Sequence, residues 1–184
     1  MLLCPAEPSG FSQTITAQLP AASSMLEALQ DWLEAAGVSL KEAMQIGLMV
    51  DELVTNTITH GYPDRHKSVT GALGYIEIHA EIFSGATASA LSNTGKTQAV
   101  VVTLKDNGIA FNPLTLPGPD LTLDIDEREI GGLGVYFVRQ LADEIDYWAD
   151  ESDRGCSAGF SAFGNRLRFV KRLSSAAANE TLSD

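Results

Sequence analysis

Residues 39–62 read SLKEAMQIGLMVDELVTNTITHGY, and this stretch predicts the central helix of the protein. Its apolar residues recur every three or four positions, which is the spacing of one helix face. Ser39 begins a capping box typical of a helix start. Gly61, expected to close the helix in a left-handed conformation, and Pro63 are typical of a helix end. We therefore expect a helix from Ser39 to about His60 that packs on the core.

A row of polar residues shares this helix with the apolar face. Glu52, Asn56 and His60 recur every four positions, so a carboxylate, a carboxamide and an imidazole lie on one side of one helix. A solvated face is the alternative explanation, but such faces usually mix Lys with Glu, and this helix has neither Lys nor Arg after Lys41. We interpret the row as a candidate site, in which His60 is a structural partner at the helix end.

Composition limits the class of protein. The chain has 184 residues, is 45% hydrophobic and carries a net charge of -12, which describes one globular domain and argues against nucleic acid or an anionic membrane as main partner. Cys4 and Cys156 are too few and too isolated for a disulfide framework or a metal site. No signal-like N-terminus and no apolar run of membrane-spanning length are present, so we expect a cytoplasmic protein.

The remaining periodic segments predict the other strands and helices. The first of them are a strand in residues 11–20 that Pro20 stops, a helix from Met25 to about Ala36, and strands in residues 74–83 and 98–108. A helix from Val135 to Ala142 follows, with Leu133, Phe137, Val138 and Leu141 inward. The last are strands in residues 144–150 and 159–173. This order favours an α+β fold, a two-layer α/β sandwich in which helices cover one face of a mixed, mostly antiparallel sheet. We expect a flexible N-terminus at residues 1–10, one domain over residues 11–173 and a disordered tail at residues 174–184.

Two further segments can contribute chemistry to the same site. Residues 131–134, GGLG, begin a helix, and the backbone N–H groups at a helix start suit a phosphate. Asp106 ends a strand, where it can accept a hydrogen bond from the exocyclic amine of a base. The oxygen of Asn56 suits Mg²⁺, and Glu52 can take a proton from a hydroxyl or water. Each residue alone is ordinary as a turn, cap or solvated side chain, but together they predict a nucleoside triphosphate site.

Residues 84–97 form a long connection that contains a second phosphate-binding candidate. Within it, ALSNTGKT at residues 90–97 nearly spells the loop of the P-loop NTPases, with alanine in place of the first glycine. That motif requires a helix after the loop, whereas the run AVVVTL here predicts a strand. Lys96 therefore would not lie at a helix N-terminus, and a P-loop nucleotide hydrolase remains only an alternative.

The ordered segments resemble the ATP-binding motifs of the GHKL superfamily, which contains DNA gyrase B, heat-shock chaperone ATPases, histidine kinases and mismatch-repair ATPases. DELVTNTITHGY (51–62) resembles the N-box, LKDNGIAFNP (104–113) and GGLGVYFVRQLAD (131–143) resemble the two glycine boxes, and GNRLRFVKRL (164–173) resembles the last strand. Within the superfamily the likeness is greatest to the anti-sigma factor serine/threonine protein kinases. The resemblance spans residues 11–173 and implies a histidine-kinase-like ATPase fold.

The resemblance also implies a role for each matching residue. Glu52 would be the general base toward the hydroxyl being phosphorylated, and Asn56 would hold Mg²⁺ against the phosphates. Asp106 would bond the adenine amino group, and Gly108 would leave room for the base. The phosphates would lie at the second glycine box, at Gly132, Leu133 and Gly134.

Residues 112–130 would form the ATP lid, and two features of this segment depart from the family pattern. Asn112 stands where related sequences often have aspartate, which affects the lid hinge rather than adenine recognition. The segment is acidic, and Arg128 is its only basic residue. Stabilisation of the transferring phosphate would therefore fall mainly on Mg²⁺, backbone amides and this one arginine.

The resemblance implies a function in regulation. The protein would use ATP and Mg²⁺ to phosphorylate a serine or threonine of an anti-anti-sigma-type antagonist protein, and would sequester a partner such as a sigma factor. The alternative is an ATP-dependent protein-binding switch without effective kinase activity. Relatives of this kind often pair through the sheet or the first helix, so a homodimer would fit, and neither nucleic acid nor a membrane is expected as a direct partner.

Overall fold

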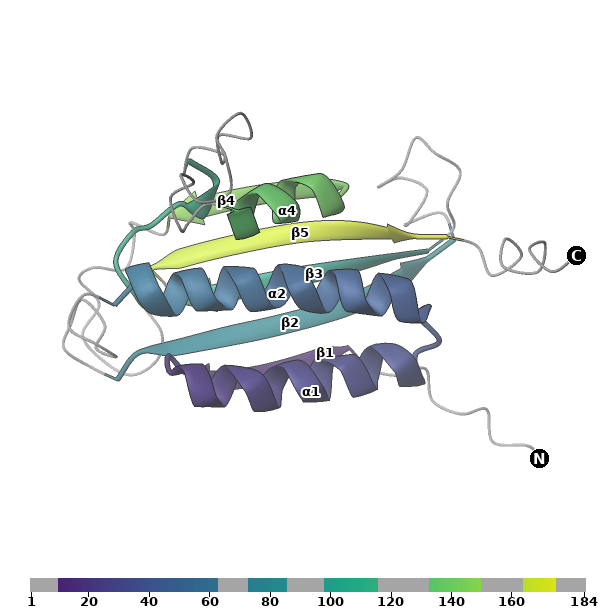
Figure 1. Ribbon diagram of the computed structural model, residues 1–184, viewed down its shortest axis with the longest axis horizontal. Coiled ribbons are helices and arrows are strands. Elements are labelled where there is room, and N and C mark those ends of the chain that lie inside the picture. Colours follow the sequence, from purple (N-terminus) through teal and green to yellow (C-terminus); the bar gives the residue numbers. More distant parts are fainter. Residues whose placement is uncertain (1–9, 63–72, 86–97, 116–132, 150–163, 175–184) are drawn as a thin grey trace, which may run out of the picture.

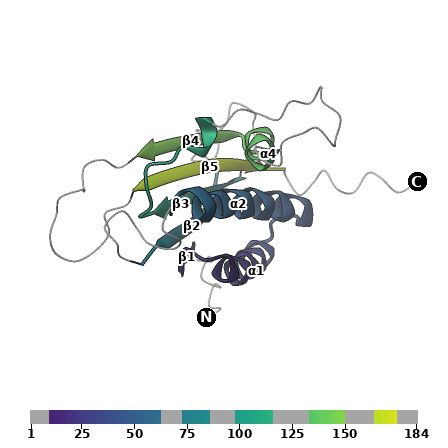
Figure 2. The same ribbon diagram turned by 60° about the vertical axis from the view of Figure 1, so that its left-hand side comes forward.

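The described part of the protein forms two layers, a five-stranded sheet and three α-helices that cover one of its faces (Figures 1 and 2). The computed structural model describes residues 10–62, 73–85, 98–115, 133–149 and 164–174. The elements are β1 (Phe11–Thr16), α1 (Leu19–Ala35), α2 (Leu40–His60), β2 (Tyr75–Ser84), β3 (Gln98–Asp106), the 3₁₀ turn η1 (Pro113–Thr115), α4 (Leu133–Leu141), β4 (Glu144–Ala149) and β5 (Asn165–Leu173). The predicted α+β sandwich with helices on one face is confirmed.

The sheet has the strand order β1-β2-β3-β5-β4, and every one of these pairs is antiparallel. Strand β5 therefore lies between β3 and β4, although β4 precedes it in the chain. Ile76, Ile78 and Ala80 of β2 point toward the helices and are buried, as their alternation with polar neighbours predicts. Among the described helices, none is long and apolar enough to cross a membrane.

Helix α2 lies at the centre of the helix layer and has the predicted bounds (Figure 1). Ser39 is its N-cap, and its side-chain oxygen accepts a hydrogen bond from the backbone N–H of Glu42 at 3.4 Å. The predicted left-handed closure at Gly61 is wrong, because this residue has φ -78°. Its N–H donates to the carbonyl of Thr57, and a Cβ there would lie only 2.6 Å from that oxygen. Glycine is thus needed for close approach and not for a left-handed turn.

Helix α1 begins earlier than its apolar spacing predicts. It starts at Leu19 rather than Met25, and Pro20 lies in its first turn. A proline fits there because the first turn of a helix leaves its N–H groups without partners in any case. Strand β1 accordingly ends at Thr16, before the proline that was expected to stop it.

Helix α4 differs from its prediction at its start and on its buried face. It begins at Leu133 instead of Val135, and it buries Val135 and Val138. Phe137, which was expected to face inward, is 41% exposed, because it lies off the face that the two valines define. Leu141 packs partly against the core as expected, whereas the side chain of Leu133 lies outside the described part.

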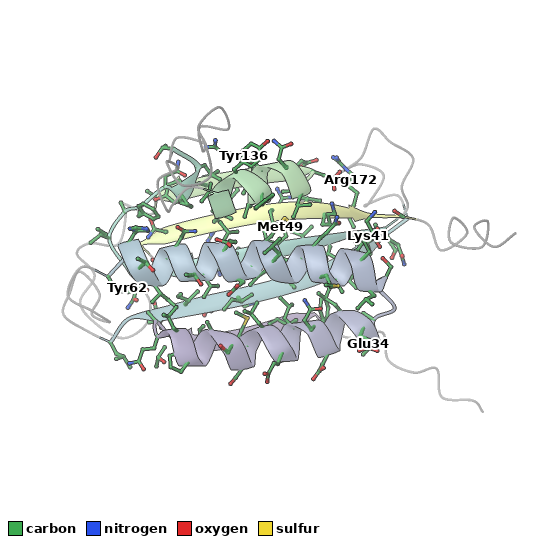
Figure 3. The ribbon with its side chains drawn as sticks, in the orientation of Figure 1. Glu34, Lys41, Met49, Tyr62, Tyr136 and Arg172 are labelled. Carbon is green, nitrogen blue, oxygen red and sulfur yellow. The ribbon has the colours of Figure 1, made fainter. Side chains whose placement is uncertain are left out.

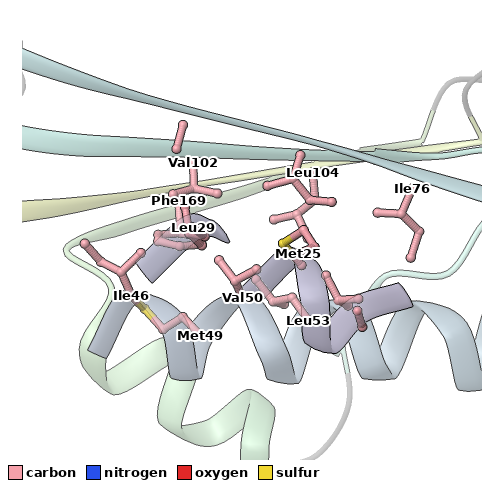
Figure 4. Packing of buried hydrophobic residues seen from close by; sticks show 14 of the residues in the cluster. Met25, Leu29, Ile46, Met49, Val50, Leu53, Ile76, Val102, Leu104 and Phe169 are labelled. Carbon is pink, nitrogen blue, oxygen red and sulfur yellow. The ribbon is translucent and has the colours of Figure 1, made fainter. Parts of the chain in front are cut away.

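The core lies between the helices and the sheet (Figure 4). Each large side chain that is buried there contributes roughly 1.5–3 kcal/mol relative to an exposed one. The fully buried residues include Met25 and Leu29 of α1, Ile46, Met49, Val50 and Leu53 of α2, and Ile76, Val102 and Phe169 of the sheet. This packing fixes the rotation of α2 and therefore the direction of its polar row.

Several predicted segments lie outside the described residues. They are residues 1–9, residues 90–97, most of the expected lid from residue 116 onward, the first part of the expected last strand before Gly164, and residues 175–184. The strand expected after residues 90–97 is present as β3, so the helix that a P-loop would require does not follow.

Candidate functional site

Three backbone segments meet where α2 ends, β3 ends and β5 begins. The N–H of Ile109 donates to the carbonyl of Gly61 at 2.9 Å, and that of Gly164 donates to the carbonyl of Asp106 at 2.5 Å. A Cβ on Gly108 would lie 2.5 Å from the Gly61 oxygen, and one on Gly164 would overlap the Gly108 oxygen. Backbone atoms cannot move aside as a flexible side chain can, so Gly108 and Gly164 are required by close approach. The predicted site residue Gly108 therefore has a structural role of its own.

Asp106 is the buried carboxylate of this junction. It is 6% exposed, and its Oδ1 accepts hydrogen bonds from the backbone N–H of Gly108 and from Nδ2 of Asn165, each at 2.8 Å. Burial raises the pKa of Asp106 to about 6, although both of these hydrogen bonds lower it. Because both bonds use Oδ1, Oδ2 is the carboxylate atom left to meet a ligand.

Asn165 holds Asp106 in place and was not among the predicted site residues. It is 4% exposed, and its Nδ2 also donates to the carbonyl of Ile109 at 2.8 Å. Its Oδ1 accepts from the backbone N–H of Phe111 at 2.9 Å and from the hydroxyl of Tyr147 at 2.5 Å. One side chain thus joins β3, β4, β5 and the segment after β3. A sequence signal could have revealed it. Asn165 occupies a buried position in the alternating pattern of β5, in which the next two buried positions hold Leu167 and Phe169.

Asn107 and Tyr62 fasten the same junction to β2. The hydroxyl of Tyr62 is shared between the carbonyl of Tyr75 at 2.7 Å and Oδ1 of Asn107 at 3.0 Å. The same Oδ1 accepts from the N–H of Tyr75 at 2.9 Å. Burial is the main cause that raises the pKa of Tyr62, which stays protonated. Figure 3 labels Tyr62 at this end of the helix layer.

A narrow pocket opens beside Asp106. Its lining combines one carboxylate and one carboxamide with mostly apolar walls, which suits a planar ring that has one polar edge. The lining residues are Leu53, Thr57, Leu104, Asp106, Phe111, Pro113, Tyr147, Asn165 and Leu167. The cavity of about 10 Å³ has room for about one water molecule, so a base would enter only after the mouth widens.

Phe111 is the wall residue that contacts the polar row of α2. Its ring lies against the imidazole of His60, with centroids 5.1 Å apart and planes inclined by 33°. His60 thus packs on the segment after β3, consistent with its interpretation as a structural partner at the helix end.

Glu52 and Asn56 lie one turn apart on α2, next to the pocket. Nδ2 of Asn56 donates to the carbonyl of Glu52 at 2.6 Å, so its Oδ1 faces away from that carbonyl. Leu53 and Thr57, each the next residue along the helix, line the pocket. The polar row and the pocket are therefore adjacent surfaces of the same helix end.

The start of α4 lies against Glu52. A Cβ on Gly134 would overlap the Glu52 carboxylate, so the two groups are in direct contact. The pKa of Glu52 is raised, first by burial and second by the charge of Asp51. The first turn of a helix carries unpaired N–H groups and a partial positive charge, so this place suits an anion. Of the predicted glycine box, Leu133 and Gly134 belong to α4, whereas Gly132 lies outside the described residues.

The donor set fits a magnesium ion that is carried by a nucleotide. Among the described residues, no group of three or more His, Cys, Asp and Glu could form a complete metal site. Mg²⁺ usually takes one or two protein oxygens and completes its octahedron with phosphate and water. Oδ1 of Asn56 is a hard oxygen ligand of that kind, and it faces away from the helix backbone.

Comparison with known proteins agrees with this geometry. None of the curated proteins compared with the chain is similar enough to count as a relative. The family model of the histidine kinase-like ATPase domain matches residues 15–171, a range that includes every residue of the site described above. Because this match spans most of the chain and agrees with the two-layer fold, the protein belongs to the family of histidine kinase-like ATPase domains.

Proposed function

We propose that the protein binds ATP at this site and acts as a protein serine/threonine kinase of the anti-sigma factor type. It would phosphorylate an antagonist protein and sequester a partner such as a sigma factor. The observation that carries the proposal is the junction on α2, where Glu52 and Asn56 lie between the start of α4 and the pocket that holds Asp106.

Asp106 would select adenine by its hydrogen-bonding pattern. Its Oδ2 can accept a hydrogen bond from the 6-amino group of adenine, and the ionised form accepts best. Guanine has a carbonyl oxygen at the same position, and two acceptors facing each other are repulsive. Asn165 supports this selection because it holds Oδ1 and leaves Oδ2 toward the pocket.

The phosphates would lie between the start of α4 and Asn56. The N–H groups of the first turn of α4 can donate to phosphate oxygens, and Gly134, which has no Cβ, lets the Glu52 carboxylate lie directly against this turn. Asn56 would ligate Mg²⁺ through Oδ1. When bound, Mg²⁺ would neutralise charge on the phosphates during transfer.

Glu52 would act as the general base. A carboxylate whose pKa is raised by burial is a stronger acceptor for the proton of an incoming hydroxyl. The hydroxyl oxygen of the substrate forms the new bond to the γ-phosphorus, the bond from that phosphorus to the β,γ-bridging oxygen breaks, and ADP leaves. The hydroxyl proton passes to the carboxylate of Glu52.

A protein-binding switch without effective transfer is the second candidate, and the lining of the site favours it in one respect. Neither lysine nor arginine is among the described residues that line the pocket beside Asp106. Kinases and GTPases commonly use such a cation to stabilise the transferring phosphate. In a switch, ATP would only change the surface that the partner meets.

Phosphate transfer and ATP binding should be measured separately to choose between the two functions. The protein, Glu52→Gln and the control Glu81→Gln, which alters an exposed residue of β2, are incubated with γ-labelled ATP and candidate antagonist proteins. We expect the wild type and Glu81→Gln to label a serine or threonine of an antagonist, and Glu52→Gln to bind ATP without labelling. Tight ATP binding with no labelling of any partner would refute the kinase and support the switch.

A further inference from the structure

Helix α2 exposes a row of large apolar residues on its first half. Leu40, Met44 and Leu48 are 77%, 62% and 42% exposed, and their spacing of four residues places them along one ridge of the helix. Single exposed apolar residues are common on soluble proteins, but three large ones in register form a continuous surface. The core does not use this ridge, because α2 buries its opposite side.

Helix α1 adds acidic residues beside this ridge. Nε2 of its Gln30 donates to the carbonyl of Ala43 at 2.9 Å, and the same side chain fills the space next to Gly47. Gln30 therefore marks the side of α1 that faces α2. Glu27 and Glu34, three residues before and four residues after it, share that side and are exposed.

The acidity of α1 is not balanced by any base on the same helix. Asp31 lies on the outer side of α1 and is also exposed, and residues 19–35 contain neither Lys nor Arg. On α2, Lys41 is the only lysine or arginine. Figure 3 shows Glu34 and Lys41 at the same end of the helix layer. The exposed surface of the two helices is thus an apolar ridge beside an acidic one.

We propose that this surface, the α1–α2 face, docks an amphipathic segment of a basic partner protein. The face comprises Leu40, Met44 and Leu48 together with Glu27, Asp31 and Glu34. The apolar side of the partner segment covers the ridge on α2, and its Lys or Arg residues meet the carboxylates on α1. Apolar contact supplies affinity, and complementary charge supplies specificity and speeds association.

Charge argues against the two other occupants of an apolar face. A second copy carries the same net charge of -12, and a two-fold axis that runs across the two helices would place the acidic side of α1 opposite an identical acidic side, which is unfavourable. An anionic membrane surface would repel both this face and the net charge of -12. An amphipathic protein segment with basic residues is therefore the occupant that fits both the apolar ridge of α2 and the acidic ridge of α1.

The ridge leads toward Glu52, which connects docking with phosphate transfer. The row that begins at Leu40 continues with the same spacing from Leu48 to Glu52, a rise of about 6 Å along the helix. A bound segment would therefore extend toward the carboxylate that is our proposed base. This connection rests on the proposed function, whereas the docking surface does not.

The test measures docking on the full chain without nucleotide, so a failure of ATP binding or of transfer cannot affect it. The probe is a fluorescent peptide of about 18 residues, made of Leu and Lys with Leu at helical spacing. One control peptide has the same residues in shuffled order, and another has Glu in place of each Lys. Fluorescence anisotropy gives each Kd.

Two double variants address the two ridges, and each has a matched control. Met44→Ser with Leu48→Ser removes the apolar ridge, and Leu73→Ser alters a residue that is 61% exposed before β2. Glu27→Lys with Asp31→Lys reverses the acidic ridge, and Glu81→Lys reverses an exposed charge on β2. Circular dichroism confirms that each variant is folded.

We expect the Leu/Lys peptide to bind the wild type and each double variant to weaken binding about tenfold or more, with controls within about twofold. Both control peptides should bind more weakly by a similar factor. Equal binding of the shuffled peptide, or equal affinity of double variants and controls, would overturn the proposal. So would sedimentation showing a dimer that Met44→Ser with Leu48→Ser dissociates, or binding to vesicles of anionic lipid that these changes abolish.

Discussion

The two ends of the site differ in how they are built. At the pocket end, Asp106 and Asn165 are almost fully buried, and five hydrogen bonds involve their side chains. At the other end, Glu52 and Asn56 are partly exposed, and one hydrogen bond and one close contact with Gly134 hold them. The pocket end is therefore positioned by the fold before any ligand arrives. The end at Glu52 and Asn56, which we call the transfer end after its proposed role, would take most of its partners from the nucleotide. If the protein has the proposed function, this difference favours strong recognition of the base and makes phosphate transfer depend on the bound nucleotide.

The largest effect should come from the backbone junction at the pocket end. In Gly164→Ala, the new Cβ meets the carbonyl of Gly108, which cannot move without separating β3 from β5. We expect a loss of roughly 3 kcal/mol in the free energy of unfolding and loss of ATP binding. Urea denaturation and binding of a fluorescent ATP analogue measure the two effects.

The matched control for this change is Gly47→Ala in the middle of α2. There the new Cβ meets only the end of the flexible Gln30 side chain, and alanine favours a helix by about 1 kcal/mol. We expect nearly unchanged stability and unchanged ATP binding. Equal losses in the two variants would show that the junction has no special rigidity.

Asp106→Asn should separate function from stability at the pocket end. The amide can keep its Oδ1 toward Gly108 and Asn165, but its Nδ2 would then face the adenine amino group, so two donors meet. We expect ATP affinity to fall about a hundredfold, while the free energy of unfolding at pH 8 rises by roughly 1–3 kcal/mol.

The pH dependence of stability follows from the same carboxylate. Burial raises the folded-state pKa of Asp106 from 3.8 to about 6, so the folded state binds the proton more tightly than the unfolded state. The wild type therefore gains stability as the pH falls through 6 toward 3.8 and loses it as the pH rises. The advantage of Asp106→Asn should be larger at pH 8 than at pH 5, and an advantage that does not change with pH would contradict the raised pKa.

At the transfer end we expect the reverse of the pocket end, namely a small change in the free energy of unfolding and a large change in the rate of phosphate transfer. In Gly134→Ala, the Cβ displaces the Glu52 carboxylate, whose side chain can rotate away. We expect a change in stability within about 1 kcal/mol, partly offset by helix propensity, and a rate of phosphate transfer that falls about tenfold or more. A large loss of stability would show that the transfer end is as rigid as the pocket end.

The parts of the structure that local sequence determines were predicted well. The bounds of α2 follow from Ser39, from its apolar spacing and from the residues after His60, all of which act within a few positions. The start of α1 was missed because Pro20 can either end a strand or open a helix, and local spacing does not distinguish them. The exposed position of Phe137 depends on which face α4 presents to the core, which a nine-residue helix specifies weakly.

The part of the site that long-range contacts determine could not be predicted. Asn165 lies 59 positions from Asp106, and nothing near it in the sequence shows that its carboxamide reaches that carboxylate. Asp106, Glu52 and Asn56 were proposed from their order and chemistry, and the structure places them around one helix end. The narrowness of the pocket and the direct contact between Gly134 and Glu52 depend on distances of a few ångströms, which residue spacing cannot predict.

The position of β5 also determines when the protein can become active during its synthesis. Strand β4 leaves the ribosome before β5, yet it pairs with β5 at the edge of the sheet, and β5 pairs with β3 on its other side. Neither β3 nor β4 can complete its hydrogen bonds until the later strand inserts between them. Because Asn165 is the first residue of β5, the nascent chain has no finished pocket beside Asp106 until that insertion occurs. Competence to bind the nucleotide would then report that the whole domain has been made.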